Sequence, residues 1–104
     1  MTGKFPLLEL DSGELIFESA SIAKYFARTA PASGLLGQSA FETAKVDEWV
    51  AFTQGKIWPA MMPVVKAALG HTIFKADVFS AGVRELKAVC KSFNDHLNNN
   101  SFLV

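Results

Sequence analysis

Two short apolar runs near the start of the chain indicate a β-hairpin. They occupy residues 5–10 and 14–17, and Asp11, Ser12 and Gly13 separate them. Gly13 has no Cβ atom, so it can adopt the positive φ angle that a tight turn needs. The pattern therefore predicts two short antiparallel strands.

A helix is predicted directly after the second run. Three apolar residues fall at helical spacing there, namely Ile22, Ala23 and Phe26. Ser19 precedes them and has the hydroxyl of a good N-cap, which would accept a hydrogen bond from a free backbone amide. We expect the helix to end near Arg28 or Thr29, because Pro31 disfavours helical geometry at the residue before it.

A capping box opens a second helical region. Ser39 and Glu42 have the Ser-x-x-Glu spacing in which each side chain satisfies a backbone amide at the start of a helix. The residues expected on one side of this helix are Val46, Trp49, Val50 and Thr53.

An interruption is predicted near Trp58, because Gly55 and Pro59 break the helical pattern and Pro63 follows one turn later. The helix should resume through Ala68. The apolar residues that would complete a buried face in this part of the chain are Trp58, Met61, Met62 and Val65.

The longest predicted helix covers residues 75–97. Its apolar residues step by four and three, in the order Phe79, Val83, Leu86, Cys90, Phe93 and Leu97. Cys90 lies in this stripe, so we expect a buried small hydrophobic residue rather than a nucleophile. His71 and His96 have no companion at metal-ligand spacing, so we expect both at the surface and no metal site.

The composition indicates one packed domain, since half of the 104 residues are apolar. Ten acidic residues balance ten basic ones, which leaves no net field to attract nucleic acid or an anionic membrane. No apolar run approaches the roughly 20 residues of a membrane span, and no signal peptide pattern opens the chain. Cys90 is the one cysteine, which suits a reducing compartment. A cytoplasmic protein without direct nucleic-acid or membrane partners is expected.

Residues 4–28 resemble the closing part of the thioredoxin-like half of the glutathione S-transferase fold. Pro6 stands where this family has a cis-proline that opens a strand. Glu18 and Ser19 stand at the pair that holds the γ-glutamyl end of glutathione. Residues 20–25 look like the S-x-A-I-x-x-Y helix of the family, with two neighbouring residues exchanged.

The later part of the chain resembles the helical half of the same fold. The residues that carry this likeness are 44–52, 69–70 and 97–104, and they look like the glutathione S-transferase-like domains of elongation factor 1 gamma and of proteins associated with aminoacyl-tRNA synthetases. The implied fold is mainly α with a short β-hairpin, a partial glutathione S-transferase-like fold.

The resemblance also implies a domain organisation. Residues 1–30 would be the end of the thioredoxin-like domain, residues 31–38 a linker, and residues 39–104 a truncated helical domain. Compared with the family, the chain begins at the third strand and stops before the usual helix cap, so both ends are expected to be cut. One strand edge would be left open, so we expect assembly with another molecule, a homodimer included.

The ligand corner implied by the resemblance consists of Pro6, Leu7, Glu18 and Ser19. Glu18 could receive an ammonium group, and Ser19 with the helix amides could receive a carboxylate. Alternatively, the two residues only stabilise the start of their helix. A cis bond would present the backbone of Leu7 to a ligand thiol, whereas a trans Pro6 would start an edge strand; the resemblance favours cis. Glutathione is the one ligand implied.

Three functional classes follow from the resemblance. The first, which we favour, is a non-catalytic interaction module of the translation machinery that docks elongation factor 1 subunits or aminoacyl-tRNA synthetases. It is favoured because the thiol-activating residue of the family lies on a first strand and helix that these residues do not include. The second is a fragment of a true glutathione transferase that conjugates glutathione to electrophiles, in which the interrupted helix near Trp58 would line the co-substrate cleft. The third is a pure packing element of a large assembly.

Overall fold

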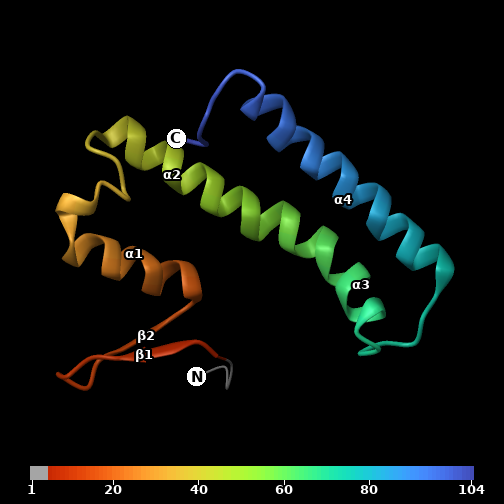
Figure 1. Ribbon diagram of the computed structural model, residues 1–104. Helices are drawn as coiled ribbons and strands as arrows, with labels where there is room; N and C mark the ends of the chain where they lie inside the picture. The colour runs from red at the N-terminus through yellow and green to blue at the C-terminus, as the bar shows by residue number, and fades with distance from the viewer. Residues whose placement is uncertain (1–4) are drawn as a thin grey trace. The chain divides into compact units, whose positions relative to one another are not determined.

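The computed structural model describes residues 5–104, which form a β-hairpin followed by helices (Figure 1). The elements are β1 (Leu7–Glu9), β2 (Leu15–Phe17), α1 (Ser19–Thr29), the 3₁₀ turn η1 (Pro31–Ser33), α2 (Ala40–Phe52), the π-helical turn η2 (Thr53–Ile57), α3 (Trp58–Ala68) and α4 (Ala76–Leu97). The predicted fold class is confirmed. The chain divides into two units, Met1–Ala44 and Lys45–Val104. The linker predicted at residues 31–38 stays a prediction.

The hairpin forms where the two apolar runs predict it. Its strands are antiparallel, with the pairs Leu7 and Phe17, Leu8 and Ile16, and Glu9 and Leu15. Gly13 has a φ of 84° in the turn, and its amide donates a hydrogen bond of 2.8 Å to the carbonyl of Leu10. Leu8 and Ile16 are half-buried on one face, while Leu7 and Phe17 are exposed on the other, as the period of a strand requires.

One prediction about the start of α1 is wrong. Ser19 is the first helical residue and not the N-cap, a position that Glu18 occupies without a side-chain hydrogen bond. Glu18 turns the chain with a φ of 70°, and its carbonyl accepts the first helical bond, 3.0 Å long, from the amide of Ile22. The helix ends at Thr29 as predicted. Phe26, predicted on the apolar face of α1, is exposed.

The capping box at the start of α2 is present with one shift. The amide of Glu42 donates to Oγ of Ser39 over 3.1 Å, as predicted. The carboxylate of Glu42 accepts from the amide of Gln38 and not from that of Ser39. Gly37 lies close to Glu42, and a Cβ atom on Gly37 would be 2.4 Å from Cβ of Glu42. Gly37 also has a φ of 75°.

The predicted interruption near Trp58 is the π-helical turn η2, through which α2 continues into α3 without a break (Figure 1). Pro63 lies inside α3. Trp58 is 56% exposed and does not complete a buried face, and Thr53 is exposed as well. The other residues predicted for these faces are half-buried, namely Val46, Trp49, Val50, Met61, Met62 and Val65.

The tightest packing of the second unit lies between α3 and α4, which run antiparallel side by side (Figure 1). Ala60 on α3 is 5% exposed, and Gly82 on α4 is also buried. A Cβ atom on Gly82 would approach Cγ2 of Val64 to 3.0 Å. The small residues thus let the two helices come close together.

The buried side of α4 differs from the predicted stripe in its second half. The half-buried residues are Phe79, Val83, Leu86, Val89, Phe93 and His96. Cys90 and Leu97 are exposed, so the prediction of a buried Cys90 is wrong. The contacting side includes Val89 and His96 in place of Cys90 and Leu97, and His96 packs against the ring of Trp49.

Candidate functional site

The structure brings the four residues of the predicted ligand corner to one end of the hairpin. Leu7 is paired with Phe17; Pro6 directly precedes Leu7, and Glu18 and Ser19 directly follow Phe17. The Phe5–Pro6 peptide bond is cis, as the resemblance predicts. All four corner residues are exposed.

Glu18 has a strained backbone at the centre of this corner. Within residues 5–104 it is the one non-glycine residue with a positive φ, at φ 70° and ψ 118°. A residue that has a side chain rarely adopts such φ and ψ angles, and this backbone conformation costs roughly 1 to 3 kcal/mol. Strain of this kind is concentrated at functional sites, where the surrounding structure holds it in place.

The N-terminus of α1 presents free hydrogen-bond donors beside Glu18. The first helical bond comes from the amide of Ile22, so the amides of Ser19, Ala20 and Ser21 have no partner within the helix. In the described part of the chain, the hydroxyl of Ser19 has no hydrogen-bond partner either. These donors and the positive end of the helix dipole can hold a carboxylate. Binding of glutathione there stays a prediction.

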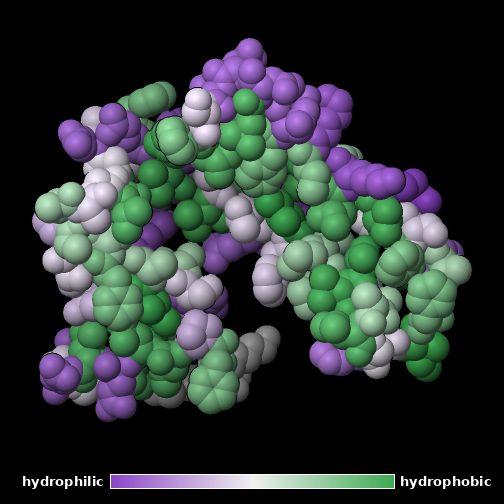
Figure 2. Space-filling model, viewed as in Figure 1, coloured by the Kyte–Doolittle hydropathy of each residue, from purple (hydrophilic) through white to green (hydrophobic). Residues whose placement is uncertain are grey.

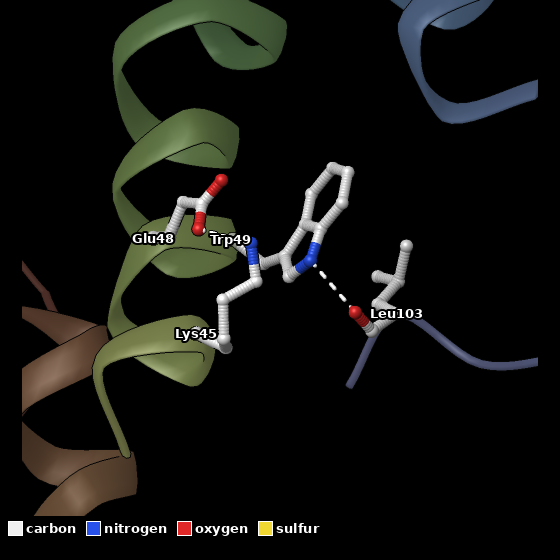
Figure 3. A network of polar contacts seen from close by, with 4 residues as sticks. All are labelled: Lys45, Glu48, Trp49 and Leu103. Atoms are coloured by element: carbon white, nitrogen blue, oxygen red, sulfur yellow. Dashed lines mark hydrogen bonds and ion pairs between the residues drawn. The ribbon is translucent and has the colours of Figure 1, made fainter. Parts of the chain in front are cut away.

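A second group of side chains joins segments that are far apart in sequence (Figure 3). The indole Nε1 of Trp49 on α2 donates a hydrogen bond of 2.8 Å to the carbonyl of Leu103. The ring of Trp49 stacks on Phe93 of α4 at 5.0 Å, and it meets the edge of Phe52 at 5.7 Å and that of His96 at 4.7 Å. Trp49 and Leu103 lie in two of the segments that carry the likeness to elongation factor 1 gamma.

His96 was predicted at the surface, and this prediction is wrong. The residue is half-buried against Trp49, and among the described residues its Nε2 atom is buried without a hydrogen-bond partner. The carbonyl of His96 accepts from Nδ2 of Asn100 over 2.9 Å. His71 is exposed, as predicted. One signal in the sequence favours burial of His96, namely its position three residues after Phe93 on the same helix.

Neither histidine belongs to a metal-binding cluster. Across residues 5–104 there is no group of three or more His, Cys, Asp or Glu side chains that could hold an ion. Within the same range, no helix is long and apolar enough to cross a bilayer.

Comparison with known proteins relates the chain to two groups. It is 35% identical over 102 residues, or 98% of its length, to the probable elongation factor 1-gamma 2 of Arabidopsis thaliana. It is 32% identical over the same share to the elongation factor 1-gamma of Prunus avium. It is also 35% identical over 98 residues, or 92% of its length, to a glutathione S-transferase-like protein of Aspergillus aculeatus.

The chain corresponds to part of each relative. It spans 24% of the two plant proteins and 46% of the fungal protein. No protein-family model matches the chain, and no solved structure matches it.

Proposed function

We propose a specific role for this chain from its similarity to elongation factor 1-gamma proteins and to fungal glutathione S-transferase-like proteins. It acts as a non-catalytic interaction module of the translation machinery in the cytoplasm. Its partners are elongation factor 1 subunits or aminoacyl-tRNA synthetases, bound through protein surfaces and without direct contact to nucleic acid.

One observation carries this proposal. Similarity to the elongation factor 1-gamma proteins extends over 98% of the chain, at identities of 30 to 35%. It therefore includes both the α2 segment with Trp49 and the segment with Leu103, which the structure joins by a hydrogen bond. Large apolar side chains such as Phe17 and Ile73 are exposed, which supports a role in docking, because such surfaces mark interaction sites.

Affinity capture with a tagged chain tests the proposal. The chain is immobilised on a resin without glutathione and exposed to a cytosolic extract, and the retained proteins are quantified by mass spectrometry. We expect subunits of elongation factor 1 or aminoacyl-tRNA synthetases in amounts close to that of the chain. A tagged unrelated domain of the same size is the control. Retention of neither group above this control would contradict the proposal.

A second candidate function is glutathione conjugation, in which the chain would form part of a transferase. Two observations favour it. The fungal relatives named as glutathione S-transferase-like are as similar, at 32 to 35% identity, as the elongation factors. The corner also combines the strained Glu18 with the free donors of Ser19.

Calorimetric titration with glutathione tests this second candidate. If the corner binds the tripeptide, Ser19→Ala should weaken binding at least about tenfold, because a hydrogen bond to a charged group contributes roughly 1.5 to 3 kcal/mol. Ser21→Ala is the matched control, since Ser21 is an exposed serine in the same helical turn. Equal weakening by both substitutions, or no binding to the unmodified chain, would exclude a glutathione corner formed by these residues.

A further inference from the structure

We draw no further inference here: the strongest candidate, the apolar surface patch that Leu69, Ile73 and Phe74 expose where α3 ends and α4 begins (Figure 2), carries nothing, because the chain spans only 24% to 49% of its relatives and nothing in the structure shows what covers this patch.

Discussion

The two units of the chain differ in how their residues are packed. In Lys45–Val104, α3 and α4 meet at the buried residues Ala60 and Gly82, and four aromatic rings lie between α2 and α4. In the described residues of Met1–Ala44 no residue is buried, and Glu18 is held at unfavourable backbone angles. The difference indicates that the helical unit supplies stability, while the hairpin unit presents backbone donors and apolar surface.

Removing an aromatic ring from the helical unit should have the largest effect. Phe93→Ala eliminates the contacts with Trp49 and Phe52, and we expect it to lower the free energy of unfolding by about 3 kcal/mol. Urea denaturation followed by circular dichroism measures the change. Phe102→Ala is the control, since Phe102 is 77% exposed and should change stability by less than about 0.5 kcal/mol. Similar losses for both variants would contradict the assignment of stability to this cluster.

Gly37→Ala tests whether the hairpin unit has a tightly packed point of its own. Gly37 and Gly34 both have positive φ angles, of 75° and 69°, but a Cβ atom would collide with Glu42 only at Gly37. We therefore expect Gly37→Ala to lower the free energy of unfolding by about 2 kcal/mol more than Gly34→Ala does. The two urea midpoints give this difference. Equal losses would show that the turn before α2 relaxes freely.

Glu18→Gly should raise stability by about 1 kcal/mol relative to Glu18→Ala, because glycine adopts the positive φ without strain. Both variants remove the same carboxylate from the start of α1, so the difference isolates the backbone. Thermal and urea unfolding of the pair measure it. If the alanine variant were as stable as the glycine variant, the corner would hold no strain.

Trp49→Phe should have the smallest effect, because it keeps an aromatic ring and loses one hydrogen bond to Leu103. We expect a loss of roughly 0.5 to 1 kcal/mol and faster amide exchange in residues 99–104. Trp58→Phe is the matched control, since Trp58 is exposed. Unchanged exchange in residues 99–104 would show that the hydrogen bond does not hold this segment.

Local sequence patterns were sufficient to predict most elements of the fold. The two apolar runs on either side of the turn at Gly13 predicted the hairpin, helical spacing after Phe17 predicted α1, and Ser39 with Glu42 predicted the start of α2. Each of these signals depends on residues a few positions apart. These three elements could therefore be predicted because local backbone chemistry determines where they form.

Other features depend on contacts or angles that no local pattern specifies. Glu18, with its positive φ, occupies the N-cap position of α1, so Ser19 is the first helical residue and does not cap the helix as predicted. Trp49 and Leu103 are 54 positions apart, and their hydrogen bond could not be anticipated from either segment alone. His96 is half-buried in place of Leu97 because it packs against the ring of Trp49. The corner residues were identified through a family resemblance, and only the strand register shows that they lie together.

Native-state hydrogen exchange across the chain tests most directly whether stability is concentrated in the helical unit. Amides in α3 and α4 should exchange only through the largest opening reaction, whereas amides in the hairpin and α1 should exchange through smaller openings of lower free energy. Equal protection in both units, or stronger protection in the hairpin unit, would contradict the difference between the two units.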